Sequence, residues 1–244
     1  GLSFRITAVP FHFYAPDVFQ GVTTSSAAML SFVPKVVGFT ALLRLLPVCF
    51  GSVGFTDWVP SGAVRVVLMV IAILTMFVGN LLALRQTSIM RLLAYSSIAH
   101  AGYMLVGLTV GNASGGTSGV AALLFYLSMY GIMTIGLFAL ITAAGSFARP
   151  LRSLSDLAGL SKSHPAIALM MAVCLIGLSG LPPTGGFLAK LNLFIAAWKE
   201  GTSDGRVLAI ILAINAVVAA TYYLRIISAM YFEQSTVVRG PSQQ

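Results

Sequence analysis

The chain has 244 residues, of which 58% are hydrophobic and 8% are charged, and its mean hydropathy is +0.95. A soluble domain carries about 25% charged residues, so this composition excludes an ordinary soluble globular protein. The net charge of +8 is not accompanied by basic runs interleaved with aromatic residues. We therefore expect basic loops beside a lipid bilayer and no nucleic-acid partner.

The apolar runs are long and do not alternate with polar residues, which favours helices over a β-barrel. We predict an all-α polytopic membrane protein with about six transmembrane helices after an opening piece, and a single transmembrane domain over residues 1–244. The chain begins with Gly1 inside an apolar piece, so we expect it to be a fragment of a longer subunit. The expected spans cover residues 24–47, 62–84, 92–110, 119–146, 166–198 and 207–232.

Lys35 lies near the middle of the first expected span, at a depth of roughly 15 Å from either side. That depth is too great for the lysine to reach the interface by snorkelling. A cation at the centre of a span costs about 2.5–3.5 kcal/mol on insertion scales, so we predict that Lys35 belongs to a proton pathway. The structural alternative is a lysine that binds the carbonyl freed by Pro34 and holds a kink between packed helices.

His100 lies in the third expected span, on a helix face that it shares with Ser96, Tyr103 and Gly107. A histidine on a polar stripe inside the membrane suits a proton relay, so we place it on the pathway. The alternative is a histidine that only joins two helices by a hydrogen bond. Ser96 and Tyr103 are secondary pathway candidates.

The fifth expected span, residues 166–198, is too long for one straight helix, because it would reach about 50 Å across a hydrocarbon core about 30 Å thick. The sequence "SGLPPTGGFLAK" (179–190) falls in its middle and contains Pro182, Pro183, Gly185 and Gly186. We predict two half-helices joined by an extended loop inside the membrane, because proline removes a backbone donor and clashes with the preceding turn. Irregular backbone at that depth is tolerated where protein or a watery cavity satisfies it.

Lys190 follows this break, and we assign it to the proton pathway together with Lys35. Its alternative role is to hold the carbonyl groups at the end of a half-helix, and the two roles are compatible. A buried lysine can bind and release a proton near neutral pH, whereas arginine stays protonated. In the last span, Asn215 and Tyr222 are further secondary candidates, with Tyr223 beside them, and a purely structural role is the competing interpretation.

No metal site is expected. Cys49 and Cys174 lie far apart in apolar surroundings and are interpreted as small buried hydrophobic residues rather than cluster or zinc ligands. The glycine-rich stretch 111–119 is interpreted as a loop between spans.

The loop charges predict the orientation in the membrane. The loops 85–91 and 147–165 and the tail from Glu233 carry more cations than the loops on the other side. By the positive-inside rule we place the richer side in the cytoplasm, together with the opening loop, and the protein in the inner (cell) membrane. The poorer side comprises residues 48–61, 111–118 and 199–206.

Five motifs together resemble the antiporter-like membrane subunits of complex I, and most closely the N-type subunit of NADH:quinone oxidoreductase. Within the first motif, "APDVFQG" distinguishes this type from the related L, M and cation-antiporter subunits. The resemblance covers essentially the whole chain. The motifs are "VPFHFYAPDVFQG" (9–21), "PKVVGFTALLRLL" (34–46), "NLLALRQTSIMRLLAYSSIAHAGYMLVGL" (80–108), "DLAGLSKSHP" (156–165) and "SGLPPTGGFLAK" (179–190).

The resemblance implies the C-terminal half of a subunit of about fourteen helices that translocates protons. By the match of motifs, the family's central membrane lysine corresponds to Lys35 and the lysine of its second broken helix to Lys190. The lysine of its first broken helix falls on Arg5, which is a departure: Arg5 is either a fixed charge on the pathway or a sign of an altered first half-channel. Met90 replaces another usual lysine, and "GVTTSS" replaces a proline-bearing motif.

The same resemblance implies a non-redox subunit of a proton-translocating NADH:quinone oxidoreductase, with no catalytic chemistry and no cofactor in this chain. NAD, FMN, iron–sulfur clusters and quinone are then expected in other subunits, and the partners are other membrane subunits of complex I. Two alternatives stay open. One is a subunit of a cation/proton antiporter of the same superfamily, and the other is a structural scaffold whose buried cations bind only backbone carbonyls or lipid.

Overall fold

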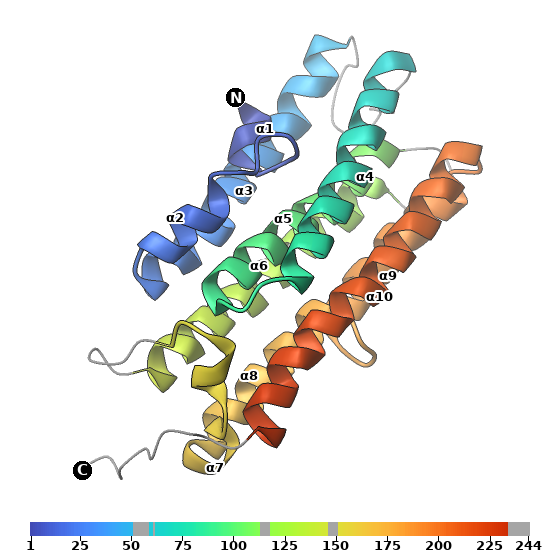
Figure 1. Ribbon diagram of the computed structural model, residues 1–244. Helices are drawn as coiled ribbons and strands as arrows, with labels where there is room; N and C mark the ends of the chain where they lie inside the picture. The colour runs from blue at the N-terminus through green and yellow to red at the C-terminus, as the bar shows by residue number, and fades with distance from the viewer. Residues whose placement is uncertain (51–58, 61, 113–117, 146–150, 234–244) are drawn as a thin grey trace.

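The computed structural model describes residues 1–50, 59–60, 62–112, 118–145 and 151–233. In this part of the chain every regular element is a helix. Figure 1 shows a bundle of long helices that run side by side, with α3 at one edge and α10 at the other. The elements are α1 (Leu2–Arg5), α2 (Ala15–Gly21), α3 (Thr24–Cys49), α4 (Gly62–Leu84), α5 (Ile89–Val110), α6 (Gly119–Ala144), η1 (Leu154–Leu157), α7 (Leu160–Ser163), α8 (Pro165–Ser179), α9 (Gly185–Lys199) and α10 (Ser203–Phe232).

The predicted fold class is confirmed. Five helices, α3, α4, α5, α6 and α10, are long and apolar enough to cross a membrane, and α8 is a shorter apolar helix. The fifth expected span is broken as predicted, into α8 and α9, with residues 180–184 between them. Cys49 departs from expectation, because it is exposed at the end of α3, while Cys174 is partly buried.

Helix α5 forms the centre of the bundle. Nearly all of its residues are buried, because α2, α4, α6 and α9 pack around it. Its closest neighbour is α4, where small residues allow the two backbones to meet: a Cβ on Gly79 would lie 2.5 Å from the backbone nitrogen of Ala99. Small residues at such contacts are typical of helix packing in membranes, where hydrophobicity does not drive helices together. Most side chains of α5, those of Arg91 and Tyr95 excepted, are therefore enclosed by other helices.

The loop 85–91 and the segment after residue 150 lie at the same end of the bundle. The backbone nitrogen of Ile89 donates to the carbonyl oxygen of Arg152 at 2.9 Å, and Leu154 donates to Thr87 at 3.0 Å. The opening segment 11–24, expected as a loop, contains helix α2 and lies at this end too, because Arg91 forms an ion pair with Asp17, with Nη2 and Oδ1 3.1 Å apart. The grouping of these loops on one side is therefore correct, whichever side of the membrane they face.

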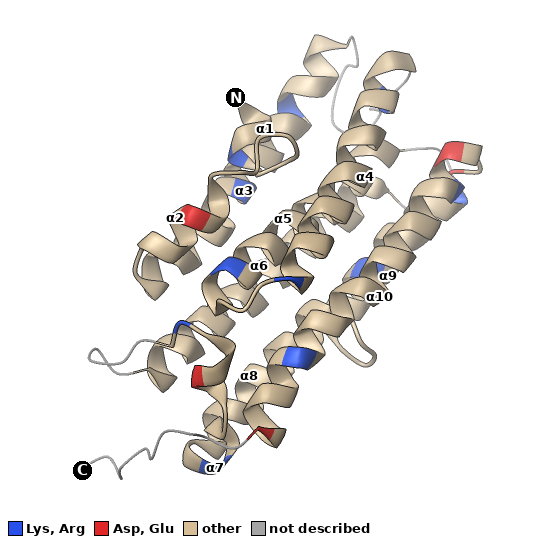
Figure 2. Cartoon of the chain, in the orientation of Figure 1, with Lys and Arg blue, Asp and Glu red and all other residues tan. Residues whose placement is uncertain are grey.

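Charged residues are sparse along the helices, as Figure 2 shows. The described acidic residues lie at or beyond helix ends: Asp17 and Asp204 in the first turns of α2 and α10, Asp156 in η1, and Glu200 and Glu233 as C-terminal caps of α9 and α10. Two cations, Lys35 and Lys190, are instead buried within the helices, and they define the candidate site.

Candidate functional site

His100 is the centre of a chain of hydrogen bonds inside the bundle. Its Nδ1 lies 2.7 Å from the hydroxyl of Tyr126 on α6, and its Nε2 lies 2.9 Å from the hydroxyl of Tyr223 on α10. Tyr223 also shares a hydrogen bond with Ser96, one turn earlier on α5. In a neutral imidazole one nitrogen donates and the other accepts, so the two tyrosines can exchange a proton through the ring.

Lys35 lies beside this chain and is 2% exposed. Its ammonium donates to the hydroxyl of Ser97 on α5 and contacts the carbonyl oxygen of Ser31, 3.4 Å away on its own helix. Tyr130 on α6 donates to the same Ser97 hydroxyl at 2.9 Å, and its ring lies 5.5 Å from the ammonium. Lys35 therefore joins α3 to α5 through neutral partners.

Lys190 lies at the break between α8 and α9, as the sequence predicts. Its ammonium donates to the carbonyl oxygens of Leu178 at 3.1 Å and Ser179 at 2.6 Å, which are among the last of α8. The chain turns away there because Gly180 adopts φ +79°, a left-handed conformation that glycine tolerates best. A cation at this end of α8 is favoured by the helix dipole. The ring of Tyr103 lies 5.2 Å from the ammonium.

The two lysines lie near His100 through different contacts. The rings of Tyr130, which contacts Lys35, and His100 are 4.9 Å apart. A cavity of about 10 Å³ separates His100 from Lys190 and is also lined by Tyr126 and Tyr130. This volume is near the lower limit for a single water molecule. Polar side chains of α5, α6 and α9 thus line one small space.

A second buried polar cluster surrounds Asn80 on α4. Its amide nitrogen donates to the hydroxyl of Tyr103 at 3.1 Å and to Oδ1 of Asn215 at 3.0 Å, and its oxygen accepts from Tyr222 at 3.1 Å. The rings of Tyr222 and Tyr223 are 4.6 Å apart, which places this cluster next to the hydrogen bonds around His100. It holds α4, α5 and α10 in register.

The structure brings together most of the residues singled out in the sequence, but not Arg5. Arg5 ends the four-residue helix α1, and its side chain is exposed, so it is not part of the buried cluster. Pro182 and Pro183 are exposed in the break, and Gly185 and Gly186 begin α9, where a Cβ on Gly186 would lie 1.8 Å from the carbonyl oxygen of Gly177. The residues that come together are Lys35, Ser96, His100, Tyr103, Lys190, Asn215, Tyr222 and Tyr223.

Sequence reasoning did not single out several polar partners. Tyr126 and Tyr130 are one helical turn apart and both buried, so an aromatic hydroxyl stripe on residues 119–146 was the available signal. Ser97 and Asn80 carry no such signal, because a single small polar residue is common in a membrane helix.

Two further features of the described residues bear on the chemistry. No group of three or more His, Cys, Asp and Glu side chains in this part of the chain could hold a metal ion. A hollow of about 560 Å³ opens at the end of the bundle near the loop 85–91 and is lined by several hydroxyl groups, among them those of Thr23, Ser88 and Thr142, and by Arg152.

Residues 1–219 match the family described as NADH:quinone oxidoreductase/Mrp antiporter, TM. The chain belongs to this family. It is 46% identical over 233 residues to NADH-quinone oxidoreductase subunit N of Trichlorobacter lovleyi, which covers 96% of this chain and 45% of the relative. This antiporter-family chain therefore spans about half the length of the curated relatives that it matches.

Solved structures agree with this assignment. A chain of respiratory complex I from Thermus thermophilus is 35% identical, with a TM-score of 0.77 over 99% of this chain and 50% of that one. A chain of the Mrp complex from Dietzia sp. is 27% identical, with a TM-score of 0.82 over 96% of this chain and 41% of that one. The resemblance identified in the sequence, to antiporter-like subunits of complex I, is confirmed.

Proposed function

We propose that this chain is part of a proton-translocating membrane subunit of NADH:quinone oxidoreductase and performs no redox chemistry itself. The observation that carries the proposal is the kind of group that binds the two buried lysines, Lys35 and Lys190. Among the described residues, neither ammonium lies within ion-pair distance of a carboxylate, and both are bound by neutral oxygens. Neutral acceptors hold a cation less firmly than a carboxylate does, so a proton can leave at less cost.

In the proposed mechanism, protons move between Lys35, His100 and Lys190 near the middle of the membrane. The hydroxyl groups of Tyr126 and Tyr223 hydrogen-bond to the imidazole, and a hydroxyl can accept one proton while it donates another. The two lysines carry like charges and both lie near the same histidine, so we treat the three groups as one coupled set.

The energy for this movement would come from elsewhere in the assembly. NAD, FMN, iron–sulfur clusters and quinone belong to other subunits in this proposal, and other membrane subunits of complex I are the partners. We place the subunit in the inner (cell) membrane, with the loops 85–91 and 147–165 in the cytoplasm, because these loops carry the greater share of cations. Arg5 is exposed and relays no proton in this scheme, since arginine does not release its proton.

The proposal is tested in the full-length subunit within the assembled complex, in membrane vesicles. Lys35→Ala and Lys190→Ala are each expected to lower the number of protons pumped per NADH oxidised, while native electrophoresis shows an intact complex. Lys162→Ala, which removes an exposed lysine from α7, is the matched control. Normal pumping in both Lys35→Ala and Lys190→Ala would reject the proposal and favour the scaffold alternative.

A cation/proton antiporter subunit remains the second candidate, because the chain of the Mrp complex has a TM-score of 0.82. The two candidates differ in ion and in driving force. Proton movement that requires NADH oxidation and is indifferent to sodium supports a complex I subunit. Proton movement that requires a sodium gradient, without NADH, supports the antiporter.

A further inference from the structure

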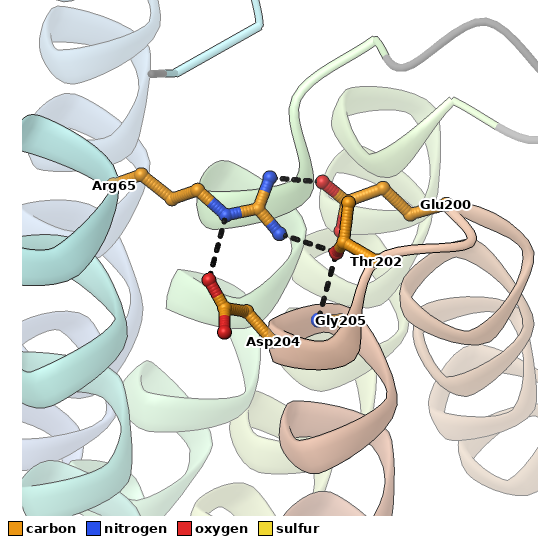
Figure 3. A network of polar contacts seen from close by, with 5 residues as sticks. All are labelled: Arg65, Glu200, Thr202, Asp204 and Gly205. Carbon is orange, nitrogen blue, oxygen red and sulfur yellow. Dashed lines mark hydrogen bonds and ion pairs between the residues drawn. The ribbon is translucent and has the colours of Figure 1, made fainter. Parts of the chain in front are cut away.

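A cluster of charges lies at the opposite end of the bundle from the loop 85–91, where α9 turns into α10. Figure 3 shows Arg65, from the first turns of α4, reaching into this turn. Its guanidinium forms an ion pair with Glu200 and donates to the hydroxyl of Thr202 at 2.9 Å. On the outer side its Nε lies 3.8 Å from Oδ2 of Asp204.

Glu200 differs from the other described acidic residues in being almost fully enclosed. Its side chain is 3% exposed, against 50% for Asp204 and 74% for Asp17, and Asp156 and Glu233 are also exposed. Only one carboxylate oxygen contacts Arg65. The other, Oε2, is buried and has no hydrogen-bond partner among the described residues. A buried carboxylate oxygen without a partner is costly, which indicates that the group is kept for a purpose other than stability.

The position of Glu200 relates it to the buried lysines. Lys190 and Glu200 lie on the same half-helix, ten residues apart, which corresponds to about 15 Å along the axis. That is half the thickness of the hydrocarbon core, so α9 leads from the middle of the membrane to its surface. The fully buried residues between them on α9 are Leu193, Ala196 and Ala197, which are apolar, and Asn192 is only partly buried. The buried face of this stretch of α9 therefore offers no continuous row of polar side chains.

The turn itself is tightly packed around Glu200. A Cβ on Gly205, in the first turn of α10, would lie 2.5 Å from the carbonyl oxygen of Ala197 and 2.6 Å from Oε2 of Glu200. The start of α10 thus presses on the end of α9, and the ion pair with Arg65 holds both against α4. Loss of the charge on Glu200 would break its ion pair with Arg65, which holds the α9–α10 turn against α4.

We propose that Glu200 is the group from which protons leave the pathway, and that Arg65 is the latch that closes it. A proton that arrives from the Lys190 side, carried by water once the turn loosens, converts the carboxylate to a neutral acid and breaks the ion pair. The acid then releases the proton to solvent near Asp204, and the carboxylate pairs with Arg65 again. The proton number balances at each step: Lys190 loses one, Glu200 gains and loses one, and the solvent receives it.

This inference rests on the proposed function, and its test separates a proton carrier from a structural clamp by two variants of one residue. Glu200→Gln keeps the length and a hydrogen-bond acceptor for Arg65 but cannot carry a proton. Glu200→Asp keeps the carboxylate but shortens the reach to Arg65. A release group predicts more protons pumped per NADH in Glu200→Asp than in Glu200→Gln, with a fall of about tenfold or more in the pumping rate of the latter. A clamp predicts the reverse order.

The measurement uses the full-length subunit in the assembled complex, with Glu233→Gln as the control for removal of an exposed acid. Pumping by Glu200→Gln at the level of Glu200→Asp or above would overturn the inference. If Glu200→Gln fails to assemble, Arg65→Gln is compared with the double variant Arg65→Gln/Glu200→Gln, and equal pumping by these two would overturn it as well. Loss of pumping in Lys190→Ala with normal pumping in Glu200→Gln would reject this inference alone, whereas normal pumping in Lys35→Ala and Lys190→Ala would reject the proposed function.

Discussion

Gly180 is expected to determine whether Lys190 can occupy its position at the end of α8. The substitution Gly180→Ala has two separate costs. The first is conformational, because φ is +79° and an L-residue in a left-handed conformation costs about 1–2 kcal/mol. The second is steric, because the new Cβ would lie 2.7 Å from Cδ and 3.0 Å from Nζ of Lys190. The lysine must therefore move away from the carbonyl groups that it binds.

The steric cost is the larger of the two for function. A hydrogen bond to a charged group contributes about 1.5–3 kcal/mol, and Lys190 makes two to the end of α8. Loss of one of them lowers the share of molecules with the lysine in place by roughly ten- to a hundredfold, since 1.36 kcal/mol corresponds to a factor of ten. We expect Gly180→Ala to lower the protons pumped per NADH toward the value of Lys190→Ala.

Gly62→Ala is the matched control for the backbone. Gly62 also has a positive φ, +55°, but nothing lies within 4 Å of the Cβ that it would gain. Both variants should lower the melting temperature of the purified complex, and only Gly180→Ala should lower pumping. Equal pumping by the two, or a further loss when Gly180→Ala is added to Lys190→Ala, would refute the reasoning that Gly180 acts through Lys190.

Two further outcomes are expected. Tyr223→Phe removes the hydroxyl that contacts His100 and should lower proton pumping in vesicles while the complex assembles; the partly exposed Tyr231→Phe is the control, and equal pumping by the two would contradict a relay through Tyr223. Gly79→Leu should prevent assembly on native electrophoresis, because even its Cβ would meet the backbone nitrogen of Ala99 at 2.5 Å; a stable, pumping complex would show that α4 and α5 can separate without loss of function.

The break in the fifth span could be predicted because its cause is local. Proline and glycine act on the backbone within one turn, so Pro182 and Gly186 indicate a break whatever surrounds them. The central position of Lys35 also follows from distance along the sequence alone. In both cases the order of residues along the chain is enough for the prediction, and no contact between helices has to be known.

The partners of the buried residues could not be predicted in this way. His100 meets Tyr126 and Tyr223, which are 26 and 123 residues away, and the contacts depend on how α6 and α10 rotate against α5. Apolar residues on every side of these helices leave that rotation open, since no polar face marks the outside. Glu200 was overlooked for a related reason: an acid in a turn is usually solvated, and only the packing of Arg65 and Gly205 encloses it.

The distribution of ionic partners distinguishes the ends of the bundle from its middle. Arg91 pairs with Asp17 at one end and Arg65 with Glu200 at the other, and each pair joins helices that are far apart in the sequence. In the middle, Lys35 and Lys190 are bound by hydroxyl and carbonyl oxygens instead. The pair at Arg91 is exposed and the pair at Glu200 is enclosed, and both fix the geometry of helix ends, whereas an ion pair in the middle would hold the proton as firmly as the side chain. Neutral oxygens beside both lysines in the described interior are the arrangement expected if protons move there, as proposed above.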